Sequence, residues 1–189
     1  MTLYRGKLNV LFINGGSGGT SIMRAFDLNK FNVSSLINCY DDGKSTGKIR
    51  DLINILGPSD IRKVQSIYLD QNIKSKQLKN IYDYRFPKFL NKIDESAFFK
   101  RELLIKKNLK KKFKIKNNLY LDYIHKNLMI FYKYFSKNNT ILSEFSLINC
   151  IITAEFLITN NIKKVINKMS NNFDIKNEIV LNSYSNRYL

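Results

Sequence analysis

The sequence predicts an α/β protein with a Rossmann-like parallel sheet. Residues 8–13 form a short apolar run that leads into glycines, which is typical of a strand followed by a turn. A second run at 33–38 follows about 25 residues later, a gap that fits one crossover helix between parallel strands. A third run near 178–182 indicates another strand, and the long stretch between is predicted to be a large, mostly helical insertion.

The segment after the first strand offers backbone to a ligand. We expect it to bind phosphate through Gly15, Gly16, Ser17, Gly18, Gly19 and Thr20. Thr20 or Ser21 is the expected cap of a helix that runs to about Phe26. Free N–H groups at a helix start attract phosphate oxygens, and a side chain on the loop would hold the ligand away. A structural turn without ligand is the alternative.

Two other glycine-loop patterns fit less well. The dinucleotide fingerprint can be laid on Gly16 and Gly18, but its last position is then Ser21. A P-loop ending at Lys44 would need glycine at position 38, which is Asn38. The glycine segment therefore belongs to neither pattern as it stands.

Two carboxylates, Asp41 and Asp42, follow the second strand at the same expected sheet edge. A carboxylate facing a phosphate is unfavourable unless a cation intervenes, and Mg²⁺ is the usual one. We expect Asp42, with or without Asp41, to hold Mg²⁺, or one of the pair to act as general base toward an acceptor hydroxyl. The sequence leaves both roles open, and a solvated turn is the alternative. The polar groups expected to complete the site are Ser45, Thr46, Gly47 and Arg50.

A third segment, 57–62, ends one helix and begins the next. Pro58 makes a rigid turn, and Ser59 or Asp60 is the expected cap. The structural interpretation needs no ligand. The functional one adds Asp60 and Arg62 to the same cleft.

A fourth candidate lies in the apolar segment 143–159. Ser146, Asn149 and Thr153 share one helical face there, so their polar groups need partners. Packing against loops is one interpretation. The other places Asn149 in the ligand cleft.

These segments together resemble the CofD/YvcK family. Its members have a strand leading into GGGTG, a second strand leading into DDGG-S-[ST]-G-x-[LI]-R, and then PPGDIR. The matching residues here are 14–18, 41–50 and 57–62, with fainter matches at 145–149 and 178–181. The resemblance implies a Rossmann-like fold and nucleotide-linked ligands. CofD enzymes use Mg²⁺ to move a phospholactate-type group from a guanosine diphosphate donor to a deazaflavin hydroxyl. YvcK relatives bind UDP-sugars and act in carbon metabolism and cell-wall control.

The chain also departs from that pattern. Ile148 replaces the glycine that precedes the matching asparagine, and the family pattern continues for about another third after Leu189. We therefore expect a single but incomplete CofD-like domain over 1–189. It is either a truncated form or one whose site is completed by a homodimer partner or a complementing chain.

The basic charge is concentrated in the middle of the chain. Residues 61–140 hold 20 Lys and Arg against 6 Asp and Glu, so they supply +14 of the net +17. We expect a basic helical insertion at 71–140. Compositional drift, an electropositive wall that attracts nucleotides, and nucleic-acid or membrane binding remain open interpretations. No nucleic-acid motif is visible, so that partner is not expected. The helices expected after residue 60 are 61–70, 73–83, 96–112, 119–136, 143–159 and 161–170.

Neither a signal peptide nor a membrane span is visible, and two cysteines make no disulfide framework. A cytoplasmic location is expected. The resemblance, with the glycine and acidic segments, implies a CofD-like, Mg²⁺-assisted transferase that moves a phosphate-linked group from a nucleotide diphosphate donor to an acceptor hydroxyl. The alternatives are a YvcK-like regulator that binds a nucleotide sugar without turnover, and an inactive or split remnant.

Overall fold

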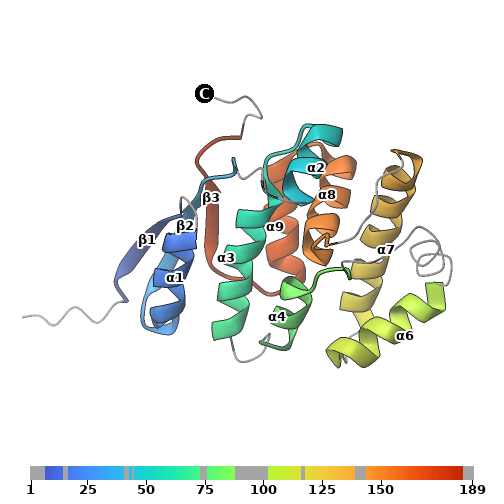
Figure 1. The fold of residues 1–189 in the computed structure, drawn as a ribbon. Helices are drawn as coiled ribbons and strands as arrows, with labels where there is room; N and C mark the ends of the chain where they lie inside the picture. Colours follow the sequence, from blue (N-terminus) through green and yellow to red (C-terminus); the bar gives the residue numbers. More distant parts are fainter. Residues whose placement is uncertain are drawn as a thin grey trace, which may run out of the picture.

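The computed structural model describes residues 7–14, 17–40, 43, 45–72, 76–87, 102–115, 118–138 and 144–184 (Figure 1). Its elements are β1 (Asn9–Asn14), α1 (Ser17–Ala25), η1 (Leu28–Lys30), β2 (Asn32–Ile37), α2 (Ser45–Ile53), α3 (Pro58–Gln71), α4 (Lys76–Asp83), α6 (Glu102–Phe113), α7 (Asn118–Phe135), η2 (Ser136–Asn138), α8 (Leu147–Thr159), α9 (Ile162–Asn172) and β3 (Glu178–Leu181).

The strands form a parallel sheet in the order β1-β2-β3. Val10 pairs with Val33 in register, and Ser35 pairs with Ile179. The α/β class and all three predicted strands are confirmed. Figure 1 shows the strands at one end of the molecule, with α1 and α3 beside them and α6 and α7 at the far end.

One face of the sheet is buried beneath helices. Along β2 the alternate residues Val33, Ser35 and Ile37 are buried, as the two-residue period of a strand requires. The Ser35 hydroxyl pairs with the Tyr68 hydroxyl of α3 at 2.6 Å and donates to the Met23 sulfur of α1 at 3.7 Å. Burial raises the pKa of Tyr68 to about 12. The central strand is therefore fixed to two helices by polar as well as apolar contacts.

The remaining helices confirm most of the predicted helical stretch. The expected start of a helix at 143 is wrong, because α8 begins at Leu147. The residues just before it bond to the chain after α4: the Phe86 N–H donates to the Phe145 carbonyl at 2.9 Å, and Ser146 forms a β-bridge with Arg85. The parts of the predicted helices at 73–75, 96–101 and 143 lie outside the described residues.

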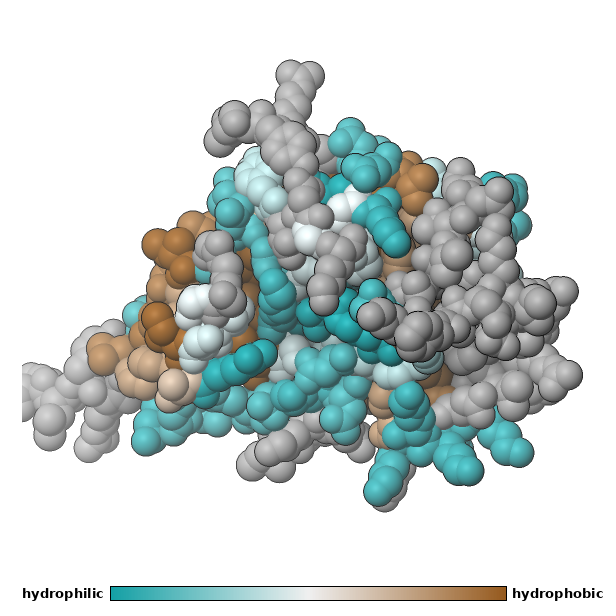
Figure 2. Space-filling model, in the orientation of Figure 1, coloured by the Kyte–Doolittle hydropathy of each residue, from teal (hydrophilic) through white to brown (hydrophobic). Residues whose placement is uncertain are grey.

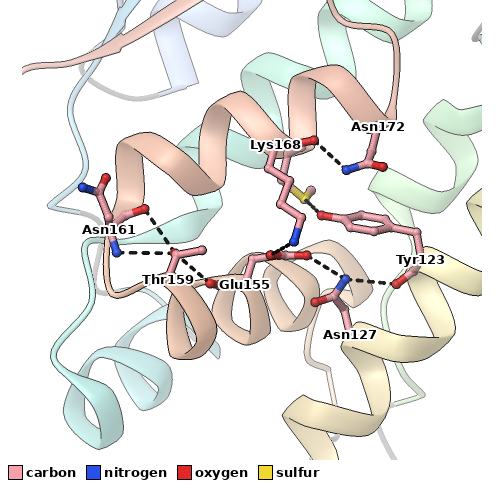
Figure 3. Close-up of polar contacts among 8 residues, drawn as sticks. Tyr123, Asn127, Glu155, Thr159, Asn161, Lys168 and Asn172 are labelled. Carbon is pink, nitrogen blue, oxygen red and sulfur yellow. Dashed lines mark hydrogen bonds and ion pairs between the residues drawn. The ribbon is translucent and has the colours of Figure 1, made fainter.

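A buried carboxylate joins three of these helices (Figure 3). Glu155 of α8 is 1% exposed, accepts from the Asn127 amide of α7 at 3.0 Å, and pairs with Lys168 of α9 at 2.7 Å. A buried charge requires partners of this kind, since desolvation disfavours the ionised form. Among the described residues, no helix is long and apolar enough to cross a membrane.

Candidate functional site

The carboxyl ends of the three strands lie side by side. The Asn38 N–H, just after β2, donates to the carbonyl of Asn14 at the end of β1 at 2.9 Å. On the other side, the Asn182 N–H donates to the Ile37 carbonyl at 3.0 Å. Open α/β sheets bind ligands at this edge, so we take it as the candidate site.

At the first strand end, the helix begins earlier than the sequence predicted. The proposed cap at Thr20 or Ser21 is wrong, because α1 already begins at Ser17. Gly18 and Gly19 therefore lie in the first helical turn, whose N–H groups have no carbonyl partner within the helix. Thr20 is buried in the next turn. Gly15, Gly16 and the Ser17 side chain lie outside what the structure describes.

The two glycines of this turn have different surroundings. A Cβ built on Gly19 would lie 2.5 Å from the Asn14 Oδ1 and 3.2 Å from the Asn14 Cα, so this glycine allows the close approach of helix and strand. A Cβ on Gly18 would meet no described atom within 4 Å. Packing therefore accounts for Gly19, whereas no described atom lies where a Gly18 side chain would be.

Asn14 is a residue that sequence analysis did not place in the site. It ends β1 directly before the glycines and is buried, and its Nδ2 donates to the Met23 sulfur at 3.4 Å. Its Oδ1 has no hydrogen-bond partner among the described residues. The signal was a polar residue directly after an apolar run, at the first position of the 14–18 match.

The second strand end leads into α2. Its predicted acidic residues, Asp41 and Asp42, lie outside the described residues, so the predicted Mg²⁺ and general-base roles stay predictions. Their neighbours are described: the Thr46 N–H donates to the Gly43 carbonyl at 3.0 Å, which fixes the start of the helix. Ser45 and Arg50 are buried, and Gly47 is half-buried.

The third segment is attached to the same strand end. The Gly57 N–H donates to the Cys39 carbonyl at 2.8 Å, and Gly57 caps α3 with Pro58 in the first helical position. The expectation that Ser59 or Asp60 caps this helix is wrong. Because glycine occupies the cap position, both side chains lie within the first turn, and Ser59 can bond elsewhere.

Ser59 joins three segments that are distant in sequence. Its hydroxyl shares a short hydrogen bond with the Thr46 hydroxyl of α2, and it accepts from the Asn149 Nδ2 of α8 at 3.1 Å. All three side chains are buried. We call this group the hydroxyl junction. The structure thus brings Thr46 and Asn149 together, but the contact runs through the buried Ser59 hydroxyl and not through a ligand.

The amide of Asn149 is only partly satisfied. Its Oδ1 has no partner within the described ranges, and neither has the buried Ser146 hydroxyl one turn earlier. Thr153 donates to the Asn149 carbonyl at 2.7 Å, one helical turn further on. Buried polar atoms without partners are rare in folded proteins, so the Asn149 Oδ1 is a candidate contact for a ligand or an ordered water.

The charged residues of the third segment point to different places. Asp60 pairs with Lys63 at 2.8 Å on its own helix. Arg62 donates to the Tyr82 carbonyl of α4 at 3.0 Å. Burial lowers the pKa of the Arg62 guanidinium, and the neighbouring charge of Arg85 adds to that effect. The Arg62 contact therefore lies at the α3–α4 packing and not at the hydroxyl junction.

Cys39, between β2 and the acidic residues, is not a nucleophile. Its thiol is buried and free, and burial together with the charge of Asp60 raises its pKa to about 12, although Arg50 opposes the shift. The thiolate is the reactive form, so this sulfur stays protonated at neutral pH.

Metal-binding groups are sparse in the described part of the chain. Within it, no three His, Cys, Asp or Glu side chains come together. The hydroxyls of Thr46 and Ser59 are oxygen donors of the type that Mg²⁺ accepts, but they bond to each other. The predicted magnesium ligands, Asp41 and Asp42, lie outside the described residues, so the magnesium site stays a prediction.

The surface hollows do not single out this edge: one of about 320 Å³ is lined by Asn160, Lys163 and Tyr184, the last of which follows the carboxyl end of β3. Another of about 680 Å³ is lined by Lys7, Asn9, Asn32 and Glu178, near the amino ends of the strands. It is opposite the end at which parallel sheets bind ligands. We therefore assign the site from the backbone arrangement at the carboxyl ends and not from this hollow.

The fold is that of an α/β protein whose described motif positions follow the carboxyl ends of neighbouring parallel strands. The family model described as 2-phospho-L-lactate transferase CofD matches residues 10–187. The chain therefore belongs to the CofD family, a family of transferases.

Relatives named for a gluconeogenesis factor support this assignment. The Nostoc sp. protein is 32% identical over 84 residues, which are 44% of this chain and 18% of that protein. The Listeria innocua protein is 30% identical over 80 residues, 42% of this chain and 24% of that protein. The matched part is thus a quarter or less of these two relatives.

A crystal structure shows the same fold. A UPF0052 family member from Bacillus halodurans superposes with a TM-score of 0.59 at 18% identity. The alignment covers 96% of this chain but only 41% of that protein. This chain therefore spans well under half of its structural relative.

Proposed function

We propose that the chain binds a nucleotide diphosphate-linked molecule at the carboxyl ends of β1 and β2 and acts as a CofD-type transferase. The observation that carries the proposal is the first turn of α1. Gly18 lies there with no described atom in the space that a side chain would fill, beside N–H groups that are free of helical partners. Such a turn suits a phosphate, which also gains from the positive end of the helix.

The acidic segment supplies the proposed chemistry. The acceptor oxygen would form a bond to the transferred phosphorus, the bond from that phosphorus to the nucleotide oxygen would break, and the acceptor proton would pass to Asp41 or Asp42. Mg²⁺ held by Asp42 would neutralise the phosphate charge. Transfer of this kind depends on positioning and charge stabilisation more than on covalent catalysis.

The hydroxyl junction would position these parts. Because Ser59 bonds to both Thr46 and Asn149, it fixes the start of α2, which directly follows the acidic residues, against α8. The contact of Gly57 with Cys39 fixes the same loop from the other side. The Asn149 Oδ1 would accept a hydrogen bond from the ligand or a water.

Nucleotide binding is tested first. Isothermal titration with guanosine diphosphate, uridine diphosphate and a UDP-sugar, each with and without Mg²⁺, should give saturable binding. Gly18→Val should abolish it while the chain stays folded, and Ile22→Ala, exposed on the same helix, should not alter it. Lack of binding by every nucleotide at millimolar concentration would refute the proposal.

The role of the carboxylate is tested separately. Asp42→Asn should remove the Mg²⁺-dependent part of the affinity and leave the metal-free affinity unchanged. If the variant keeps its full response to Mg²⁺, Asp42 is not the metal ligand.

A second candidate function is a binding regulator of the YvcK kind. The relatives named for a gluconeogenesis factor favour it. Phosphorus NMR of a bound UDP-sugar distinguishes the two: new phosphorus signals indicate transfer, whereas an unchanged ligand that is retained through repeated binding indicates regulation.

A further inference from the structure

Arg62 on α3 is a buried cation with few acceptors. The residue is 7% exposed, and its one hydrogen bond in the described part of the chain runs from Nη1 to the Tyr82 carbonyl of α4 at 3.0 Å. Its buried Nε has no partner there. A buried charge normally has an ionic partner and satisfied hydrogen bonds, because desolvation is costly. Arg62 therefore carries an unused donor in a place where unused donors are rare.

The two carboxylates near Arg62 are paired with other side chains. Asp60 pairs with Lys63 at 2.8 Å, and Asp83 pairs with Lys79 at 2.6 Å. The charges of Asp60 and Asp83 favour the protonated form of Arg62, but they do not outweigh burial, so the pKa of Arg62 remains lowered. Within the described ranges, neither carboxylate forms an ion pair with Arg62.

Two more arginines add positive charge around Arg62. Arg85 follows α4, and its Nη1 donates to the Glu144 carbonyl at 3.0 Å. Arg24 lies in the last turn of α1. Both side chains are exposed. Burial lowers the pKa of Arg62, and the charges of Arg85 and Arg24 add to that effect. We call these three residues the arginine cluster: Arg24, Arg62 and Arg85.

The arginine cluster belongs to the side of the molecule that α1, α3 and α4 form. Figure 1 shows these helices side by side. Figure 2 shows hydrophilic side chains over α3, whereas apolar ones gather at the β1 end. Among the described residues, no member of the cluster is in an ion pair. The positive charge of the three guanidinium groups is therefore uncompensated.

We propose that the arginine cluster binds a phosphate oxyanion, either inorganic phosphate or the phosphate of a small phosphomonoester. A guanidinium binds phosphate through two parallel N–H groups. Because the Tyr82 carbonyl uses Nη1, the Nε side of Arg62 supplies this edge. A phosphomonoester carries a charge of about −1.5 to −2 at pH 7. It therefore offsets more of the positive charge of the cluster than a carboxylate does.

This site is separate from the proposed nucleotide site. Arg24 follows Gly18 by about 9 Å along the axis of α1, at the rise of an α-helix. Arg62 bonds to α4 and takes no part in the hydroxyl junction. A phosphate at the arginine cluster thus requires neither the first turn of α1 nor the acidic segment. A failure of nucleotide binding would leave this inference standing.

Titration calorimetry of the 189-residue chain tests the inference with inorganic phosphate, ribose 5-phosphate and acetate. Both phosphates should bind saturably and compete with each other, and acetate should bind about tenfold more weakly or not at all. Tighter binding of ribose 5-phosphate identifies a phosphomonoester as the ligand. Equal or weaker binding of that ester identifies free phosphate. Lack of saturable phosphate binding at millimolar concentration overturns the proposal.

Variants assign the binding to the cluster. Arg62→Lys keeps the charge but loses the paired N–H groups, so it should weaken phosphate binding by about tenfold. Arg24→Gln with Arg85→Gln should weaken it by about fivefold. Both of these residues are exposed, so this double variant decides the matter if Arg62→Lys fails to fold. Lys133→Gln, at an exposed position of α7, should leave the affinity unchanged.

One further variant distinguishes the two proposed sites. Gly18→Val, which should abolish nucleotide binding, should retain a phosphate site that Arg24→Gln with Arg85→Gln weakens. The proposal is overturned if Gly18→Val abolishes phosphate binding altogether, or if the double variant binds phosphate as tightly as the wild type.

Discussion

At the scale of single residues, packing explains one of the two glycines in the first turn of α1 and not the other. Gly19 lies against Asn14, whereas Gly18 faces space free of described atoms. Glycine inside a helix costs about 1 kcal/mol relative to alanine. Near a helix start this cost is smaller, and packing against the described residues does not explain Gly18.

The first prediction follows from this contrast. Gly18→Ala should raise the free energy of unfolding by about 0.5–1 kcal/mol and weaken nucleotide binding. Gly19→Ala should lower the free energy of unfolding by about 1–3 kcal/mol, because the new Cβ overpacks against the backbone of Asn14. Urea unfolding and titration calorimetry measure both effects. An equal loss of stability in the two variants would contradict the assignment.

The hydroxyl junction gives the second prediction. Ser59→Ala leaves the Asn149 amide and the Thr46 hydroxyl without their shared partner, and a buried unsatisfied group costs about 1–3 kcal/mol. We expect a loss of that size in chemical denaturation. Ser34→Ala, which removes a hydroxyl that bonds to the exposed Glu178, should change stability by less than about 0.5 kcal/mol. Equal effects would mean that the junction contributes little.

At the scale of elements, Glu155 determines how α7, α8 and α9 pack (Figure 3). Lys168→Met should destabilise the protein by about 2–4 kcal/mol, since it leaves the buried Glu155 without its charge partner. Glu155→Gln should cost less, because the Lys168 side chain is 43% exposed and can be hydrated. The double variant should cost less than the sum of the two. Thermal unfolding in a double-mutant cycle measures the coupling. Strict additivity would show that the pair is energetically independent.

The contact between α3 and α4 predicts a pH dependence. Burial alone would raise the pKa of Asp83, but hydrogen bonds from Lys79 and Ser66 bring it below its ordinary value of 3.8. The carboxylate therefore stabilises the fold above that value, and this contribution is lost as the pH falls below about 4. Asp83→Asn should be less stable than the wild type at pH 7, and the difference should shrink toward pH 3. A constant difference across that range would refute the assignment.

At the scale of the whole molecule, sequence patterns predicted most of the framework. The short apolar runs identified the strands, because buried parallel strands are apolar along their length. The helix starts were less predictable. Gly18 and Gly19, which the sequence places in a loop, lie in the first turn of α1, and Gly19 packs there against Asn14. The Glu155 network depends on contacts between distant segments, which local spacing does not show. Asp41 and Asp42 remain sequence predictions.

The basic helix α6 lies at the end of the molecule remote from β1 (Figure 1). We expect Lys107→Gln, Lys110→Gln and Lys111→Gln together to leave nucleotide affinity within about twofold, since exposed charges are screened at physiological salt. A large loss of affinity that disappears at high salt would instead support an electropositive wall.

Lys112→Gln is the contrasting variant. The Lys112 ammonium lies 4.0 Å from the Tyr84 ring centroid, and the loss of this contact should cost about 0.5–1 kcal/mol of stability.

The arrangement at the first turn of α1 has an evolutionary consequence. Selection for folding alone would keep Thr46, Ser59 and Asn149, because each satisfies another inside the protein. The same selection places no described packing demand on Gly18. In a lineage that has lost its ligand, position 18 should therefore be substituted first, while Thr46, Ser59 and Asn149 are retained because they stabilise the fold.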